Sequence, residues 1–383
     1  MDKALERWVN CGLLKAIMNI SRRELIALLG AGALGSSRSW AAQPEGKTYG
    51  VALVGLGSYA TGQLGPALLE TKRARLTGIV TGSPEKIPSW REKYGVAEGN
   101  VYSYENFDEI ADNKDIDVIY IVLPPGMHAE YSIRAAEAGK HVICEKPMAA
   151  TVEECDAMIA AAKKNKVGLH IGYRLHWDPY HQRLMEVART EEMGKLKDFS
   201  AALAYQDRNP KAWKLSKKLG VAGELYNLGT YPVQAALYTV RENPIRVTAT
   251  SHNARPELFT ETPEGYDWVF EFPGGVKASG FASSAKSGNF LKADAEKGGF
   301  GLDQQAFAYG GIGGYVGEKR MNFPEVNQQA LQIDGMCASL DKGEKGLAPG
   351  EMGRRDVALL QAIMKSAETG KPVEIGDLGY PAV

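Results

Sequence analysis

Short apolar runs alternate with amphipathic stretches between residues 49 and 171. This alternation predicts strands joined by helices, and such units build a mostly parallel sheet with helices on both faces. The run at 118–123 is apolar on both faces, as an interior parallel strand should be. The predicted strands are 51–54, 76–80, 118–123, 141–144 and 167–171, and the predicted helices are 64–71, 84–94, 107–111, 128–138 and 151–164.

Beyond residue 172 the pattern changes to strands that follow one another through turns such as Pro273-Gly274-Gly275. It predicts a second, α+β domain around a large open sheet that is mostly antiparallel. Its predicted strands are 199–205, 245–251, 267–272 and 276–283. Segment 298–317 is rich in glycine and aromatic residues. It fits a long loop, which could line the substrate pocket or an interface, and no helix or strand is assigned to it. A last helix over 356–369, ended by Gly370, is predicted to return to the first domain.

The length of 383 residues suits two domains, predicted at 47–171 and 172–383. A net charge of -1 gives no support to binding of nucleic acid or an anionic membrane surface, so small molecules and other subunits are the expected partners. The 4 cysteines have neither the C-x-x-C spacing nor the histidine spacing of a metal site. No metal is predicted, a disulfide framework is not expected, and buried thiols are.

The N-terminal segment has the pattern of an export signal. Arg22 and Arg23 precede an apolar stretch, 25–34, which is shorter than the roughly 20 residues that span a bilayer. Small residues follow at 39–42, as a signal peptidase requires. Residues 1–42 are therefore predicted to be a twin-arginine signal that exports the folded protein to the periplasm. The alternative is an amphipathic helix packed on the fold, although the stretch has no polar face.

The first predicted strand runs into a glycine loop, Gly55-x-Gly57-x-x-Ala60, that opens a helix. This is the setting of a Rossmann dinucleotide-binding fingerprint, in which glycines allow a tight turn and a close approach of the pyrophosphate. The pyrophosphate then lies at a helix N-terminus. A plain strand-to-helix turn is the structural alternative.

The end of the second strand favours NADP over NAD. NAD-binding proteins usually carry an acid there for the ribose hydroxyl. Here Thr81, Gly82 and Ser83 are followed by Lys86, and Pro84 should direct Glu85 elsewhere. Small hydroxyls with a cation suit a 2′-phosphate.

Lys146-Pro147 follows the strand 141–144, at the edge where ligands bind in such sheets. A lysine there can hold a hydroxyl, stabilise an alkoxide or assist proton transfer. The alternative is a solvated surface lysine. Asn227 and Tyr231 lie at i and i+4 of a predicted helix, and an ammonium beside a phenol favours loss of its proton.

Another polar cluster follows the strand 167–171, and it fits either a substrate rim or a structural corner. It comprises Tyr173, Arg174, His176 and Asp178. His128, just after Pro124-Pro125, is more often a helix-start residue than an acid.

Together these motifs resemble the glucose–fructose oxidoreductase / inositol dehydrogenase family, and most of all its glucose–fructose oxidoreductase branch. The segments that carry the resemblance are Val54-Gly55-Leu56-Gly57-x-Tyr59-Ala60, 141–148, Ile171-Gly172-Tyr173-Arg174-x-His176-x-Asp178-Pro179 and Gly229-x-Tyr231.

The resemblance implies a Rossmann domain, an open sheet that forms the substrate face and an oligomer contact, and tightly held NADP. It implies that Lys146, Tyr231 and Asn227 form the catalytic group, with Tyr231 as acid and base. The implied cofactor residues are Gly55, Leu56, Gly57, Ser58, Tyr59, Thr81, Gly82, Ser83, Lys86, Leu123, Pro124, His128, Glu145, Lys146 and Arg174. The implied substrate residues are Tyr173, Arg174, His176, Asp178 and Trp213.

The chain departs from the family pattern in two respects. The family usually has Asp at the position of Asn227, and an amide cannot act as a base. The arm that covers the cofactor in the best-known relative is reduced here to 43–47.

The leading hypothesis is a periplasmic NADP-dependent oxidoreductase of aldoses or polyols that couples oxidation of one sugar to reduction of another. A conventional dehydrogenase with exchangeable cofactor, a nicotinamide-assisted glycosidase and a non-catalytic sensor remain the alternatives. A homodimer or homotetramer through the open sheet is expected.

Overall fold

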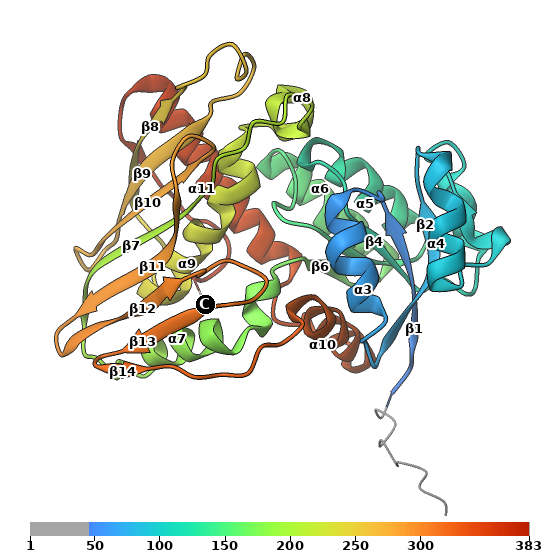
Figure 1. Ribbon diagram of the computed structural model, residues 1–383, viewed down its shortest axis with the longest axis horizontal. Coiled ribbons are helices and arrows are strands. Elements are labelled where there is room, and N and C mark those ends of the chain that lie inside the picture. Colours follow the sequence, from blue (N-terminus) through green and yellow to red (C-terminus); the bar gives the residue numbers. More distant parts are fainter. Residues whose placement is uncertain (1–45, 383) are drawn as a thin grey trace, which may run out of the picture. The chain divides into compact units, whose positions relative to one another are not determined.

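A computed structural model describes residues 46–382, and the predicted export signal at 1–42 lies outside the described residues. The described chain forms two sheets, which Figure 1 shows on the two sides of the molecule. The first is parallel and belongs to the N-terminal half. The second is larger and belongs to the C-terminal half.

The first sheet has the order β3-β2-β1-β4-β5-β6, and each strand pair is parallel. Val54 at the end of β1 pairs with Val80 of β2 and with Ile121 of β4, so these strands end level with one another. Their carboxyl ends therefore form one edge. The strands are β1 (Tyr49–Val54), β2 (Ala74–Val80), β3 (Val101–Tyr102), β4 (Val118–Ile121), β5 (His141–Cys144) and β6 (Leu169–Ile171).

The helices between these strands lie near their predicted positions. The first begins earlier than predicted, with a π-helical turn before α3. The elements are the π turn (Ala60–Leu64), α3 (Gly65–Leu68), α4 (Ile87–Tyr94), a 3₁₀ turn (Phe107–Asp112), α5 (His128–Glu137) and α6 (Val152–Asn165). Thr151 caps α6 by accepting from the Glu154 N–H at 3.2 Å, while the Glu154 carboxylate accepts from the Ala150 N–H at 2.9 Å. The capping box therefore closes one residue before the cap.

The second sheet has the order β14-β13-β12-β11-β7-β10-β9-β8-β15. Its neighbours are antiparallel except for β7 and β10, which run parallel. The strands are β7 (Leu196–Ala204), β8 (Arg246–His252), β9 (Gly265–Glu271), β10 (Lys277–Ser283), β11 (Gly288–Ala295), β12 (Gly298–Gln304), β13 (Gly313–Val316), β14 (Lys319–Arg320) and β15 (Val373–Glu374).

The interpretation of 298–317 as a long loop was wrong, because the segment contains β12 and β13. Its glycines hid the period-2 pattern by which a strand is recognised. At Gly301 a Cβ would lie 2.3 Å from the Leu291 carbonyl oxygen, so this strand position has no room for a side chain.

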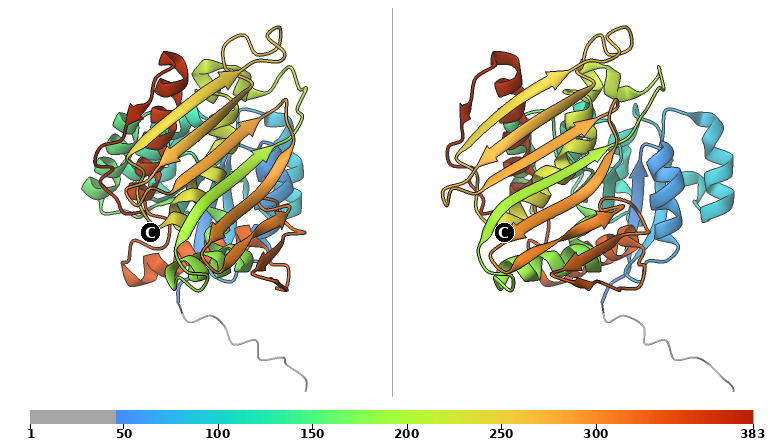
Figure 2. Two further views of the ribbon diagram at one scale, coloured as in Figure 1. Left: turned by 90° about the vertical axis from the view of Figure 1, so that its left-hand side faces the viewer. Right: turned by 60° about the vertical axis from the view of Figure 1, so that its left-hand side comes forward.

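Helices cover one face of the second sheet and leave the other bare, as Figure 2 shows. The covering helices are α7 (Pro179–Arg189), α9 (Thr230–Val240) and α11 (Gly350–Thr369). By contrast, α10 (Gln328–Lys342) packs Ile333 and Met336 into the core of the first sheet. Helices α7 and α10 were not predicted, and α11 begins before its predicted start at 356.

The three cysteines in the described part, Cys144, Cys155 and Cys337, are buried free thiols. None of the helices in residues 46–382 combines the length and the apolar character that crossing a membrane requires.

Candidate active site

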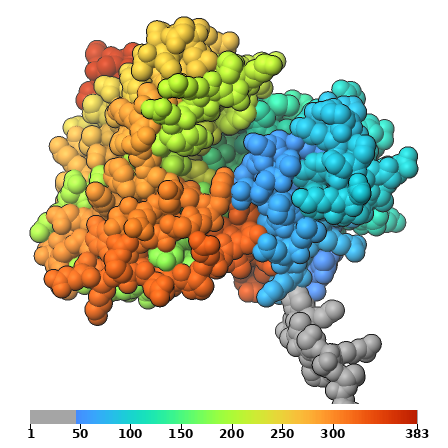
Figure 3. Space-filling model, in the orientation of Figure 1, coloured from blue at the N-terminus to red at the C-terminus, as the bar shows by residue number. Residues whose placement is uncertain are grey.

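A cavity of about 810 Å³ opens at the carboxyl edge of the first sheet. In Figure 3 the surface is recessed between the blue residues that follow β1 and the lime-green residues that follow β7. Sixteen residues predicted for the site line the cavity: Gly55, Leu56, Gly57, Ser58, Tyr59, Thr81, Gly82, Ser83, Lys86, Leu123, Pro124, Glu145, Lys146, Trp213, Asn227 and Tyr231. The fold thus brings the predicted cofactor and catalytic groups to one place.

The glycine loop has the shape that a dinucleotide requires. Gly55 has φ +92°, and a Cβ there would lie 2.5 Å from the Val122 carbonyl oxygen. At Gly57 a Cβ would meet no atom within 4 Å. Because Gly57 lines the cavity, this open space allows a pyrophosphate to approach the backbone closely. The loop therefore fits a dinucleotide cofactor.

The loop after β2 offers hydroxyls and one ammonium. The Thr81 hydroxyl oxygen accepts from the Ser83 N–H at 3.0 Å, and the Lys86 ammonium donates to the Leu56 carbonyl at 2.9 Å. Lys86 thus bridges this loop to the glycine loop. Glu85 is not among the described residues that line the cavity. The donors present at this end suit a phosphate group better than a ribose hydroxyl alone.

Lys146 follows β5 and is half-buried at the cavity wall. Its ammonium donates to the Asn227 carbonyl oxygen at 2.7 Å and lies 4.6 Å from the centre of the Tyr231 ring. The Lys146–Pro147 peptide bond is cis. These contacts contradict the alternative of a solvated surface lysine.

Tyr231 is the second residue of α9, which follows a π-helical turn (Leu225–Gly229) that carries Asn227. Its hydroxyl accepts from Arg174 Nε at 3.3 Å. Two cations, Lys146 and Arg174, therefore lie against this phenol, with the Arg174 guanidinium 5.1 Å from the centre of its ring.

Arg174 is buried and does not line the cavity itself. Its guanidinium donates to the carbonyls of Ala308 at 3.0 Å and Phe307 at 2.6 Å, and also to the Gln328 side chain. It thereby holds the loop between β12 and β13 against the site.

That loop brings Tyr309 to the cavity. The Tyr309 ring stacks on Tyr59 of the glycine loop, with centres 6.0 Å apart, and Arg174 lies 4.3 Å from its centre. Burial raises the pKa of both phenols. Sequence reasoning did not assign Tyr309, and its only signal was the aromatic content of segment 298–317.

Glu145 lies behind Lys146 at the cavity floor. Its carboxylate accepts from the Tyr120 hydroxyl at 2.7 Å, and that hydroxyl accepts from Gln332 at 2.7 Å. Burial raises the pKa of the Glu145 carboxyl. The neighbouring Lys146 opposes that shift without reversing it.

The wall opposite the glycine loop comes from the segment after β7 and from the turn before α9. Sequence reasoning missed its Tyr205, Asp207, Asn209, Lys211 and Lys214. The Lys214 ammonium lies 2.5 Å from Asp207 and 2.5 Å from Glu224, and only 4% of the residue is exposed. Burial alone would lower the pKa of Lys214, but the Glu224 and Asp207 charges outweigh it and raise that pKa.

Four of the predicted residues, besides Arg174, do not line the cavity. The ring nitrogens of His128 contact the Leu123 and Pro147 carbonyls at 2.7 and 2.8 Å, so this histidine joins two loops beneath the cavity. Asp178 caps α7 by accepting from the Tyr180 and His181 N–H groups. The set that does not line the cavity is His128, Tyr173, His176 and Asp178, besides Arg174.

A parallel sheet in the order 3-2-1-4-5-6, a glycine loop and a lysine–tyrosine pair at its edge define a dinucleotide-dependent oxidoreductase. Residues 49–173 match the GFO/IDH/MocA oxidoreductase family with its NAD-binding Rossmann fold, and residues 181–304 match the GFO/IDH/MocA C-terminal domain. The chain belongs to the GFO/IDH/MocA family, which is the family that the sequence motifs resembled.

Among solved structures, the aldose-aldose oxidoreductase from Caulobacter crescentus complexed with glycerol is 32% identical, with a TM-score of 0.82 over 86% of this chain and 100% of that one. D-xylose 1-dehydrogenase [NADP(+)] from Haloarcula marismortui is 24% identical over 85% of this chain and 92% of its own. The uncharacterized oxidoreductase ORF334 from Rhizobium meliloti is 28% identical over 52% of this chain, and the match spans 58% of ORF334.

Proposed function

We propose that the protein is an NADP-dependent oxidoreductase of sugars, acting on an aldose or a polyol. The observation that carries the proposal is the placement of Lys146 and Tyr231 together at the cavity wall, beside a glycine loop shaped for a dinucleotide. The names of the Caulobacter and Haloarcula proteins, which act on aldoses and xylose, support the substrate class. Lys86 with the hydroxyls of Thr81 and Ser83 supports NADP.

A nicotinamide held in this cavity would supply the carbon that takes or gives hydride. Tyr231 takes the proton of the sugar hydroxyl that is oxidised, or returns it in the reverse direction. Lys146 holds the same sugar oxygen and stabilises its negative charge as the proton leaves. Gly57 and Ser58 would hold the pyrophosphate through their backbone N–H groups, while the Gly55 N–H is already bonded to the Val80 carbonyl at 3.0 Å.

The proposal includes export and retained cofactor. The predicted twin-arginine signal supports a periplasmic location, where a free nicotinamide pool is absent. An enzyme there needs to reduce one sugar for each that it oxidises, and the name of the Caulobacter protein supports such coupling.

The uncovered face of the second sheet supports assembly into a homodimer or homotetramer. Val269, Phe281 and Phe290 line a recess on that sheet, which fits burial in an oligomer.

The testing experiment is mass spectrometry of the nucleotide released from purified protein, followed by mixing of the protein with pairs of sugars such as D-glucose and D-xylose. Stoichiometric NADP, with conversion of both sugars and no added nucleotide, is the expected result. An empty protein that turns over sugar only with added NADP⁺ indicates a conventional dehydrogenase.

Two further outcomes would replace the proposal. Hydrolysis of a chromogenic glycoside without net redox change would indicate a nicotinamide-assisted glycosidase. If nucleotide is bound but none of the tested aldoses or polyols changes its absorbance, the protein would be a sensor.

A further inference from the structure

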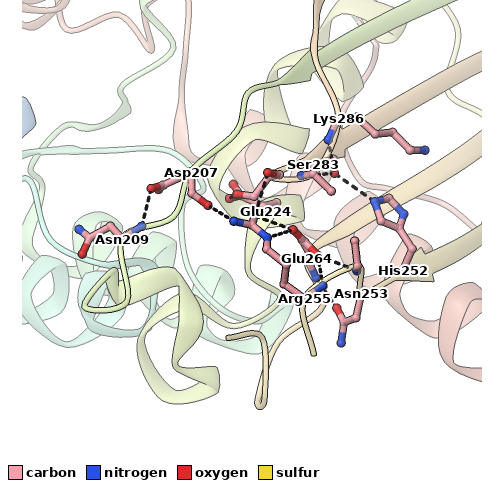
Figure 4. A network of polar contacts seen from close by, with 12 residues as sticks. Asp207, Asn209, Glu224, His252, Asn253, Arg255, Glu264, Ser283 and Lys286 are labelled. Carbon is pink, nitrogen blue, oxygen red and sulfur yellow. Dashed lines mark hydrogen bonds and ion pairs between the residues drawn. The ribbon is translucent and has the colours of Figure 1, made fainter. Parts of the chain in front are cut away.

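Glu224 is a fully buried carboxylate one helical turn before Asn227. Its Oε1 lies 2.5 Å from the Lys214 ammonium and accepts from the Ser284 hydroxyl. Its Oε2 accepts from Asn227 Nδ2 at 2.8 Å. Figure 4 shows Glu224 in the polar network that also includes Asp207, Arg255 and Glu264. The mechanism uses neither Glu224 nor this network.

The contact with Glu224 decides how the Asn227 amide is oriented. An ionised carboxylate only accepts hydrogen bonds, so the amide must turn its NH₂ group toward Glu224. The amide is planar, and its Oδ1 therefore points to the other side. Asn227 lines the cavity together with Tyr205, whose phenol also forms a hydrogen bond with the Asn227 side chain, whereas Glu224 does not line it.

The backbone of the same residue is fixed as well, because its carbonyl oxygen accepts from Lys146 at 2.7 Å. Asn227 is thus held from both sides, by the catalytic lysine at its main chain and by Glu224 at its side chain. Its side-chain oxygen is an acceptor of defined direction beside Lys146.

We propose that Glu224 is a positioning residue, which fixes the Asn227 carboxamide so that Oδ1 accepts a hydrogen bond from a substrate hydroxyl. The substrate is then recognised at this point as a hydrogen-bond donor, as a sugar or polyol hydroxyl is. The pair consists of the Glu224 carboxylate and the Asn227 carboxamide, and only the uncharged carboxamide faces the cavity. This proposal rests on the proposed function.

The test is an exchange of the two groups. Glu224→Gln lets the Asn227 amide turn over, since a carboxamide at 224 can face it with either of its ends. Asn227→Asp places two carboxylates within hydrogen-bond distance. The double variant E224Q/N227D restores one carboxylate and one carboxamide with their positions exchanged, and the carboxylate introduced at position 227 still presents an acceptor to the cavity. The wild-type protein, the two single variants and the double variant form a double-mutant cycle.

The expected result for Glu224→Gln is a KM for sugar that rises roughly 10-fold or more, the scale of one lost hydrogen bond to a fixed partner. NADPH affinity, measured by fluorescence, should stay within about twofold, because the mutated pair lies across the cavity from the glycine loop. In E224Q/N227D the KM should return toward the wild-type value. Thermal unfolding midpoints should fall in each single variant and recover in the double one.

Glu264→Gln is the matched control. Glu264 is also fully buried and forms an ion pair with Arg255 at 2.5 Å, but it neither lines the cavity nor contacts Asn227. It should lower the unfolding midpoint and leave the KM unchanged.

A folded Glu224→Gln variant with the wild-type KM would overturn the proposal. So would an equal rise in KM in Glu264→Gln, or a double variant no better than the worse single one. A wild-type protein that turns over no sugar would overturn the proposed function instead. The unfolding midpoints need no substrate and would still decide whether positions 224 and 227 are coupled.

Discussion

The Lys146 ammonium lies over the face of the Tyr231 ring, 4.6 Å from its centre, and its hydrogen bond goes to a main-chain carbonyl. The two residues come from different domains, one from the end of β5 and the other from the start of α9. The pair therefore exists only when both domains are folded and packed together. It also leaves the Tyr231 hydroxyl available to a substrate.

Lys146→Ala should lower kcat by roughly 100-fold or more, because it removes the cation that stabilises the developing alkoxide. NADPH affinity should change far less. Steady-state kinetics and fluorescence titration measure the two quantities. Lys292→Ala, on the uncovered face of the second sheet, is the control and should leave kcat unchanged. A Lys146→Ala variant with wild-type kcat would contradict the assignment.

Tyr231→Phe should lower kcat on a similar scale of roughly 100-fold, because it removes the proton donor and acceptor. Tyr238→Phe is a control on the same helix. The Tyr238 hydroxyl bonds His181 Nδ1 at 2.7 Å and lies away from the cavity, so its loss should affect stability alone. Equal rate losses in both variants would count against a catalytic role for Tyr231.

Lys86→Ala should weaken NADP binding by roughly 10-fold or more and leave NAD binding nearly unchanged, because only NADP carries the 2′-phosphate. Calorimetric titration with each nucleotide measures the ratio. Glu85→Ala, the neighbouring residue outside the cavity, should leave that ratio alone. Parallel losses for both nucleotides in Lys86→Ala would argue against a phosphate contact.

Tyr309→Ala should speed nucleotide dissociation by up to roughly 10-fold, the scale of one aromatic stacking contact. Stopped-flow displacement of bound NADPH measures the rate. Tyr315→Ala, on β13 of the same segment but outside the cavity, is the control. An unchanged dissociation rate in Tyr309→Ala would mean that the Tyr59–Tyr309 stack does not retain the nucleotide.

Stability should fall as pH drops from about 6.5 to about 4. Burial lowers the pKa of His170, His176 and His181 to about 4 from the usual 6.5. Each histidine therefore binds its proton more readily once the chain unfolds, so acid favours unfolding by up to about 1.4 kcal/mol per pH unit and histidine. His170→Phe should make this decline shallower, because it removes one of the groups that take up a proton on unfolding. Phenylalanine suits this position because, within residues 46–382, the His170 ring nitrogens have no hydrogen-bond partner. An equal slope in the variant, measured by chemical denaturation, would contradict this.

The sequence predicted five of the six strands of the first sheet, because these strands are apolar and alternate with helices. The two-residue strand β3 was missed. Most of the residues predicted to bind the cofactor line one cavity, and each of them lies in a local strand–loop–helix pattern. Thr81, Ser83 and Lys86 could be assigned because a few adjacent positions determine their geometry.

The opposite wall could not be predicted in the same way. The contact between Lys214 and Glu224 depends on how a loop packs against a helix turn, and no local period encodes it. Asp178 shows the opposite mistake. It was assigned to substrate binding, although its sequence context indicates the start of a helix. Asp followed by Pro179 is a common signature of a helix start, and it marks the beginning of α7.

The hydrogen bonds from Arg174 to the carbonyls of Phe307 and Ala308 limit how a nucleotide could enter or leave the cavity. A hinge that swung the second sheet away from the first would have to strip a buried guanidinium of these acceptors, which is costly. Exchange of a nucleotide is therefore expected to require the movement of a side chain and not of a domain. Tyr309, which is 46% exposed at the cavity rim and stacks on Tyr59, is the side chain whose rotation would open the cavity.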